Sequence, residues 1–258
     1  MEPNISFYHA KLKVDWAGIL INELNIAQER FIDSNTYNIS LQFSPEEQCC
    51  LFKVGDIPIP FQIPCLIGDI CHNLRASADF CWMGLHRSIH NKPNAKHTIP
   101  IADNVKGLVS IAGKAFEGEA AANISTFLTD VIKTHRDFER GGNKMFIALN
   151  ELSNWQKHNM LIAAPMVTKL GKNSVIKSND GSKIVCGGAA ISNNQVPFAI
   201  GGTEAEFTYD SEPTLEIGMN VKHLNGLQPI IPTLIQFHQC ATEIVNAFSE
   251  SFGNPSAT

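Results

Sequence analysis

Residues 64–90 read PCLIGDICHNLRASADFCWMGLHRSIH, and their spacing predicts one long helix with two different faces. Each residue of a helix advances by about 100°. The apolar side chains then share one face, which we expect to pack against a core: Ile67, Ile70, Leu74, Ala78, Cys81 and Leu85. A polar stripe about 120° wide by the same geometry lies at or beyond the border of that face: Asp69, His72, Arg75, Asp79 and His86.

The segments on either side of this helix predict an α+β fold. We expect a bundle of long helices with an N-terminal β-hairpin, and a C-terminal antiparallel sheet followed by a helix. The expected helices cover residues 7–33, 64–90, 143–163 and 232–252, with two more inside 105–140. The expected strands are 37–43 and 49–54, a hairpin over 174–191 that turns at 179–181, and 196–200, 205–209 and 214–221.

We expect one domain over residues 1–258. Within it, a helical part covers about 1–165 with the hairpin at 37–54, a strand-rich part covers about 174–221, and the closing helix covers about 232–252. The predicted buried face of the first helix consists of Leu12, Trp16, Ile19, Leu20, Glu23, Leu24 and Ala27. The apolar face of the second helix inside 105–140 consists of Ile124, Phe127, Leu128, Val131 and Ile132.

Composition excludes several classes of protein. A net charge of −5 over 258 residues argues against a broad basic surface for nucleic acid. The seven cysteines are odd in number and form no Cys-x-x-Cys pair, which argues against a disulfide framework or a cysteine-rich zinc site. The sequence shows no secretory signal, and its apolar stretches are too short to span a bilayer. We therefore expect a cytoplasmic protein without membrane contact.

The polar stripe of residues 64–90 carries groups that support acid–base chemistry or anion binding. His72, Arg75 and Asp79 follow one another at steps of three and four residues, close enough to hydrogen-bond. An aspartate beside an arginine stays ionised, and a histidine beside an aspartate is held charged or in one tautomer. Two other interpretations stay open: a solvated charged helix face, or a buried network that locks helix packing.

A second polar constellation lies on the helix expected over 143–163. Glu151, Asn154 and His158 share one face, and Lys157 lies nearby. Asparagine is less suited to a helix interior than alanine because its side chain competes for backbone hydrogen bonds. Asn154 therefore indicates a specific partner, although a helix end with polar residues facing solvent explains the pattern equally well.

No catalytic residue is assigned from these patterns. The catalytic candidates are His72, Arg75, Asp79, Glu151 and His158. The ligand-binding candidates are Asp69, His72, Asn73, Arg75, Asn154, Lys157 and His158. No metal site is predicted, because no carboxylate or thiol stands at ligand spacing from the histidines around residues 86–97. The cofactor and the partners stay unknown, and a homo-oligomer formed through an exposed sheet edge is left open.

The two polar segments resemble the motifs of a family of uncharacterised bacterial proteins. One motif has the form Gly-Asp-x-x-His-Asn-Leu-Arg-x-x-x-Asp, which here covers Gly68 to Asp79. The other has the form Glu-Leu-x-Asn-x-x-Lys-His, which here covers Glu151 to His158. The resemblance extends over most of the chain and supports this choice of residues, but it implies no function.

The chain is also similar, more loosely, to the helical HEPN class, many of whose members are metal-independent ribonucleases. The marker of that class is an arginine followed by a histidine after four to six intervening residues. In the bacterial family the residue after the aspartate is often histidine, whereas Phe80 stands there in this chain. None of the other four arginines has a histidine at that spacing, so the chain departs from the ribonuclease marker.

Three functions therefore compete. The first is a binding or interaction protein whose polar groove between two helices holds an anionic ligand through Arg75, His72, Lys157 and His158. The second is a hydrolase or HEPN-like ribonuclease, with His72 or His158 as the base, Asp79 or Glu151 orienting it, and Arg75 stabilising negative charge. The third is a purely structural network that packs the helices together.

Overall fold

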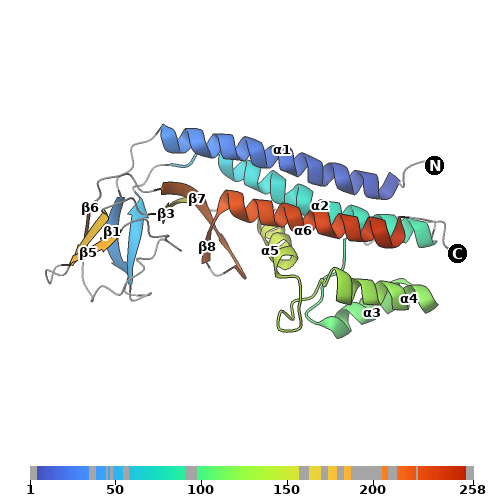
Figure 1. Ribbon diagram of the computed structural model, residues 1–258. Helices are drawn as coiled ribbons and strands as arrows, with labels where there is room; N and C mark the ends of the chain where they lie inside the picture. The colour runs from blue at the N-terminus through green and yellow to red at the C-terminus, as the bar shows by residue number, and fades with distance from the viewer. Residues whose placement is uncertain are drawn as a thin grey trace. The chain divides into compact units, whose positions relative to one another are not determined.

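The chain folds as an α+β protein of long helices and short antiparallel strands (Figure 1). The computed structural model describes residues 5–34, 39–44, 46, 49–54, 58–90, 98–156, 163–169, 174–178, 183–186, 205–208, 214–224 and 226–253. Its contacts divide the chain into two compact units. The helical unit comprises Met1–Asn22, Leu66–Asn159 and Leu234–Thr258, and the β-rich unit comprises Glu23–Cys65 and Met160–Thr233. The N-terminal hairpin thus groups with the later strands, while the single-domain organisation stays a prediction.

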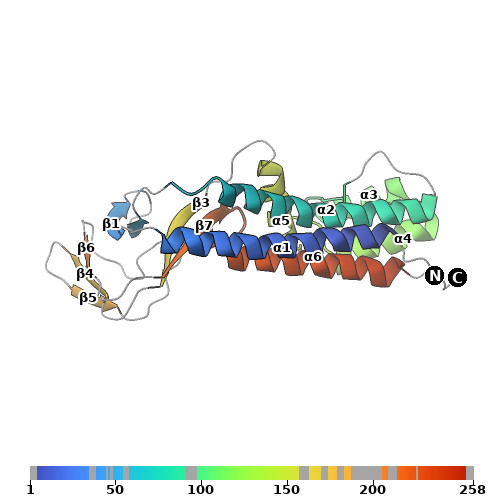
Figure 2. The same cartoon turned by 90° about the horizontal axis from the view of Figure 1, so that it is seen from above.

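The helical unit is built on three long helices that lie side by side (Figures 1 and 2). They are α1 (Ile5–Asp33), α2 (Gln62–His90) and α6 (Ile230–Phe252), close to the bounds that the sequence predicts. The predicted apolar face of α2 is confirmed, because all six of its side chains are at most 1% exposed. α2 therefore forms the centre of the core of this unit.

α1 carries two apolar stripes, and the predicted face mixed them. Leu20 and Leu24 are buried, but Leu12, Trp16 and Ile19 are 44–50% exposed, so that part of the prediction was wrong. The buried stripe follows steps of three and four residues along the opposite side: Phe7, Ala10, Val14, Ala17, Ile21, Leu24, Gln28 and Phe31. Both stripes have helical spacing, so periodicity alone does not choose between them.

Close packing between α1 and α6 explains which stripe is buried. His238 of α6 donates a hydrogen bond from Nε2 to the carbonyl oxygen of Val14 at 3.2 Å. A Cβ atom at Gly18 would lie 3.2 Å from the same Nε2, tighter than ordinary contact. Ala10 and Ala17 are fully buried nearby in the sequence. Small side chains therefore let α1 approach its neighbour on this side, which the bulky Trp16 stripe does not.

Two short helices and a π-helical turn follow α2. Asn104 caps α3 (Val105–Ala115) by accepting a hydrogen bond from the backbone of Gly107 at 3.0 Å. α4 (Gly118–Thr126) continues into the π-helical turn η1 (Phe127–Val131). Helical structure ends there and does not continue toward Arg140, which corrects the predicted extent. Val131 is 54% exposed, against prediction, because it is the last residue of this wider turn, which changes the helical phase.

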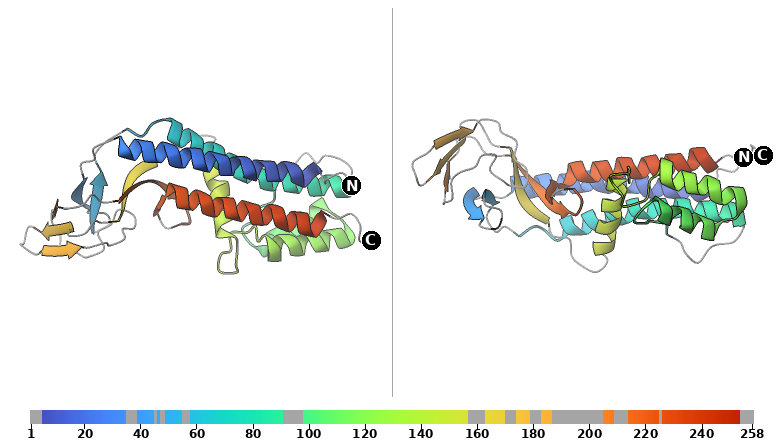
Figure 3. Two further views of the ribbon diagram at one scale, coloured as in Figure 1. Left: turned by 45° about the horizontal axis from the view of Figure 1, so that its top comes forward. Right: turned by 90° about the horizontal axis from the view of Figure 1, so that it is seen from below.

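The helix α5 (Lys144–Gln156) is shorter than the sequence predicts. Asn143 caps it by accepting a hydrogen bond from the backbone of Phe146 at 3.0 Å. The prediction that it reaches residue 163 was wrong, because Ala163 opens the strand β3 (Ala163–Lys169), which includes Pro165. In Figure 3, α5 runs across the direction of the long helices of the helical unit.

The described residues of the β-rich unit form three small antiparallel sheets. The predicted N-terminal hairpin is confirmed as β1 (Ile39–Ser44) and β2 (Cys49–Val54), paired from Ile39 with Val54 to Ser44 with Cys49. The predicted later hairpin is β4 (Ser174–Ser178) with β5 (Lys183–Cys186), and β6 (Ala205–Thr208) pairs with β4 on its other side. The turn at 179–181 and the strand expected over 196–200 lie outside the described residues.

The third sheet contains two strands that the sequence did not predict. Its order is β3, β7 (Thr214–Val221) and β8 (Gly226–Pro229), and only β7 was expected. Gln28 of α1 accepts a hydrogen bond from the backbone of Ile217 at 3.2 Å, which joins this sheet to the end of α1 within the β-rich unit. None of the described helices is both long and apolar enough to cross a membrane.

Candidate functional site

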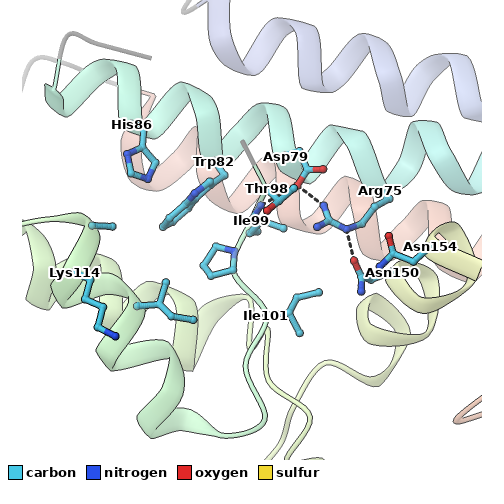
Figure 4. Close-up of a pocket in the computed structure, with 13 residues that line it drawn as sticks. Arg75, Asp79, Trp82, His86, Thr98, Ile99, Ile101, Lys114, Asn150 and Asn154 are labelled. Atoms are coloured by element: carbon cyan, nitrogen blue, oxygen red, sulfur yellow. Dashed lines mark hydrogen bonds and ion pairs between the residues drawn. The ribbon is translucent and has the colours of Figure 1, made fainter. Parts of the chain in front are cut away.

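A cavity of about 600 Å³ opens in the helical unit between α2, α3 and α5 (Figure 4). The segment from Thr98 to Ile101 forms part of its wall, together with the last turns of α3. The helices α2 and α5 contribute six side chains: Arg75, Asp79, Trp82, His86, Asn150 and Asn154. The cavity therefore brings together residues from both polar segments that the sequence singled out.

The four residues of α2 that line the cavity follow one another at steps of four, three and four. This spacing keeps their side chains on one side of the helix. Asp69 and His72, which belong to the same predicted stripe, are exposed and do not line the cavity. The stripe is thus divided: Arg75, Asp79 and His86 turn toward the cavity, and the other two turn toward solvent.

Arg75 links the two polar segments directly. Its Nε donates a hydrogen bond of 2.6 Å to Oδ1 of Asn150 on α5. Its Nη1 donates to Oδ1 of Asp79, which confirms the expected pairing along α2. The guanidinium also lies 5.5 Å from the centroid of the Phe146 ring, within the range of a cation–π contact. Arg75 as a whole residue is only 7% exposed, so its guanidinium is a nearly buried cation.

Asp79 has a second partner that gives it a structural role as well. Its Oδ1 accepts a hydrogen bond of 2.8 Å from the backbone nitrogen of Ile99. The carboxylate therefore ties the segment that lines the cavity to α2. Removing its charge would affect both Arg75 and the position of this wall.

Asn150 is a residue of the site that the sequence patterns did not single out, although its spacing from Asn154 could have indicated it. It stands four residues before Asn154, so both side chains lie on one face of α5. Because its oxygen accepts from Arg75, its amide nitrogen points away from the guanidinium, as Figure 4 shows. Asn154 is exposed at the same wall. An amide with its oxygen engaged presents its NH₂ group as a donor.

Asn73 lies on a different side of α2. Its Oδ1 accepts a hydrogen bond of 2.8 Å from Nζ of Lys13 on α1, and its Nδ2 donates to the backbone oxygen of Asp69 at 2.7 Å. It lines a smaller cavity of about 250 Å³ beside Trp16 and Phe80. The structure therefore separates Asn73 from Arg75, although the sequence grouped them as ligand-binding candidates.

Glu151 also lies away from the Arg75 cavity. Its Oε1 is 3.5 Å from Nε of Arg136, which in turn lies 3.3 Å from a carboxylate oxygen of Asp103 through Nη1. The remaining candidates, Lys157 and His158, lie outside the described residues.

The far end of the cavity is aromatic. The ring of His86 lies 4.8 Å from that of Trp82 and 4.5 Å from that of Phe116, centroid to centroid. Burial, followed by the neighbouring His90, lowers the pKa of His86 below its usual value. The imidazole is therefore neutral at neutral pH. Trp82 and Phe116 were not among the residues that the sequence selected.

The two buried thiols of α2 contribute packing and no nucleophile, whereas Cys65 on the same helix is exposed. Cys71 and Cys81 are free and buried. Burial raises the pKa of Cys71 to about 12, so its thiol stays protonated and unreactive. Among the described residues, no group of three or more His, Cys, Asp or Glu side chains is placed to hold a metal ion.

No protein-family model, curated protein or solved structure matches the chain. The resemblances to the bacterial family and to the HEPN class therefore stay predictions from sequence motifs. The function of the chain has to be inferred from the geometry and the charges of the cavity.

Proposed function

We propose that this chain is a binding protein that holds a small organic anion in the cavity between α2, α3 and α5. The observation that carries the proposal is the nearly buried guanidinium of Arg75 on the cavity wall, held there by Asn150. Burying a cation is costly, and its pairing with Asp79 offsets part of that cost. A purely structural pair would not need to border a cavity.

The charges of the lining residues favour one negative group. Arg75 and Lys114 are cationic, and Asp79 supplies one negative charge, so the described wall carries an excess of one positive charge. The amide nitrogen of Asn150 adds a neutral donor close to the guanidinium. A volume of about 600 Å³ lies within the range of small-molecule sites. Together these features fit a carboxylate or phosphate bound beside Arg75 and Asn150.

Hydrolysis is not proposed for this cavity. The acid–base candidates His72 and Glu151 do not line it, and Arg75 and Asp79 are engaged with each other. Among the described residues of the cavity wall, the one imidazole is that of His86, at the opposite end from the guanidinium.

The test replaces Asn150 by aspartate. Asn150→Asp keeps an oxygen for Nε of Arg75 but replaces the amide donor by a negative charge. We expect binding of inorganic phosphate and benzoate, measured by calorimetry, to weaken by roughly 10- to 100-fold, as for a lost hydrogen bond to a charged group. The matched control is Asn123→Asp, which makes the same charge change at an exposed position of α4 that does not line the cavity.

Two results would overturn the proposal. One is that neither anion shows saturable binding to the wild-type chain. The other is that both anions bind equally well to the Asn150→Asp and Asn123→Asp variants, which would place any anion site elsewhere on the chain.

A further inference from the structure

The imidazole of His86 has polar atoms that the described part of the chain leaves without partners. The residue is 2% exposed, yet neither Nδ1 nor Nε2 makes a hydrogen bond to any described residue. Its ring neighbours Trp82 and Phe116 have no hydrogen-bond acceptor, and His90, whose ring centroid lies 5.6 Å away, makes no hydrogen bond to it. Buried polar side chains in folded proteins nearly always have a partner. Because His86 lines the cavity, a group bound there is the candidate for that partner.

The character of the missing partner follows from the state of the ring. A neutral imidazole offers one N–H donor and one bare nitrogen acceptor. A hydroxyl group can accept from the N–H of the imidazole or donate to its bare nitrogen. A heterocyclic nitrogen does one of these: without a hydrogen it accepts from the N–H, and with a hydrogen it donates to the bare nitrogen. A second carboxylate or phosphate matches less well, since the neutral imidazole offers an anion no positive charge and its bare nitrogen needs a donor. The His86 end therefore fits an uncharged hydrogen-bonding group.

The spacing along α2 sets the length of the ligand. The guanidinium of Arg75 is held against Asp79, and His86 stands seven residues after Asp79 on the same face of α2. Seven residues are nearly two helical turns, or about 10 Å along the axis. Between His86 and the guanidinium, Figure 4 shows Trp82 on the same face of α2, and the lining also includes the apolar Ile99 and Ile111. A flat or apolar body suits this middle part.

We propose that the anion held beside Arg75 is elongated and aromatic, with its acidic group at Arg75 and Asn150 and an uncharged hydroxyl or ring nitrogen at His86. This inference rests on the proposed function and adds the shape and the far end of the ligand. Two sources share this chemistry. One is a phenolic or heteroaromatic carboxylate, and the other is a nucleoside monophosphate, whose phosphate and base stand at opposite ends.

The test compares ligands that differ only at the far end. 4′-Hydroxybiphenyl-4-carboxylate and biphenyl-4-carboxylate form one pair, and adenosine 5′-monophosphate and 1-deazaadenosine 5′-monophosphate, which has a C–H group in place of one ring nitrogen, form the other. For the pair that matches the natural source, we expect the ligand with the hydrogen-bonding end to bind the wild-type chain roughly 3- to 10-fold more tightly, as for one neutral hydrogen bond. The pair that shows the larger preference identifies the source. These comparisons need no substitution in the protein.

The protein variant then assigns the preference to His86. His86→Phe keeps a ring in the same pocket and removes both nitrogen atoms, so we expect the two ligands of the pair to bind it equally. His72→Phe is the control, because it makes the same change at an exposed position of α2 away from the cavity. It should keep the full preference.

The outcomes separate this inference from the proposed function. If anions bind and Asn150→Asp weakens them, but neither pair shows a preference, the proposed function stands and this inference is refuted. The same holds if the preference persists in His86→Phe. If no anion binds at all, the proposed function itself fails.

Discussion

Replacing His86 by phenylalanine should stabilise the unliganded chain. The buried imidazole has two nitrogen atoms without partners among the described residues, and such an unsatisfied group costs about 1–3 kcal/mol. The phenyl ring would lie among Trp82 and Phe116, whose ring centroids are 4.8 and 4.5 Å from that of the imidazole. Phenylalanine is larger than histidine, and overpacking costs about 1 kcal/mol or more, unless the cavity admits the extra volume.

The net gain in the free energy of unfolding is therefore about 1 kcal/mol at neutral pH, from the difference of these two terms. For a chain of this size, that gain raises the melting temperature by roughly 2–4 °C. The assay is urea unfolding followed by circular dichroism, with thermal melting as a second measure. A variant that is less stable than the wild type by about 1 kcal/mol or more would refute the reasoning, because it would show that His86 is satisfied in the folded chain.

The same variant should change how stability depends on pH. The unfolded chain protonates this imidazole near its usual pKa of about 6.5, but burial, followed by His90, lowers the pKa of His86 in the folded chain. The stability that His86 contributes by staying neutral is complete above about pH 6.5 and is lost as the pH falls toward the lower folded pKa. Because His86→Phe cannot take up this proton, its advantage over the wild type should grow below pH 6.5. An advantage that stays constant from pH 7.5 to 5.5 would contradict the lowered pKa.

Three further substitutions and one labelling experiment test the packing around the site and within the core. Gly18→Ala should destabilise the chain by about 1 kcal/mol in urea unfolding, because its Cβ would lie 3.2 Å from an imidazole nitrogen of α6. Gly113→Ala should stabilise the chain by about 0.5–1 kcal/mol, because its Cβ on α3 would meet nothing within 4 Å. Equal effects of the two substitutions would contradict the packing argument. Asp79→Asn should destabilise by about 3 kcal/mol, because Arg75 would lose its charge partner in a nearly buried site, and an unchanged urea midpoint would show that the pair is dispensable. Cys71 should react with a maleimide at pH 8 only after unfolding, because burial raises its pKa to about 12; mass-spectrometric detection of labelling in the native chain would contradict this.

Local sequence predicted the elements with strong periodicity. The buried face of α2 followed from apolar residues at steps of three and four, and the hairpin of β1 and β2 followed from alternation of polar and apolar residues. The strands β3 and β8 were missed. The predicted helix took in the first residue of β3, Ala163, and the rest of β3 was assigned to no element, while β8 is four residues long. Short or proline-containing strands carry little local signal, and their pairing with β7 is what makes them strands.

The site was predicted in part. The pairing of Arg75 with Asp79 is a property of one helical turn, so the sequence was sufficient to predict it. The contact between Arg75 and Asn150 joins residues 75 positions apart, and no local pattern contains that distance. The aromatic end was missed for the same reason, since Phe116 reaches His86 from beyond α3.

The sequence by itself determined which residues share a face of each helix, because helical geometry is set by neighbours three and four positions away. Only the tertiary structure decided what each face meets. It buried one apolar stripe of α1 and exposed the other, since close approach to α6 requires the small residues around Gly18. It also turned Arg75 and His86 toward one cavity while His72 faces solvent. Amphipathic patterns show which side chains of a helix face are apolar or charged, whereas shape and long-range contacts determine which element packs against that face.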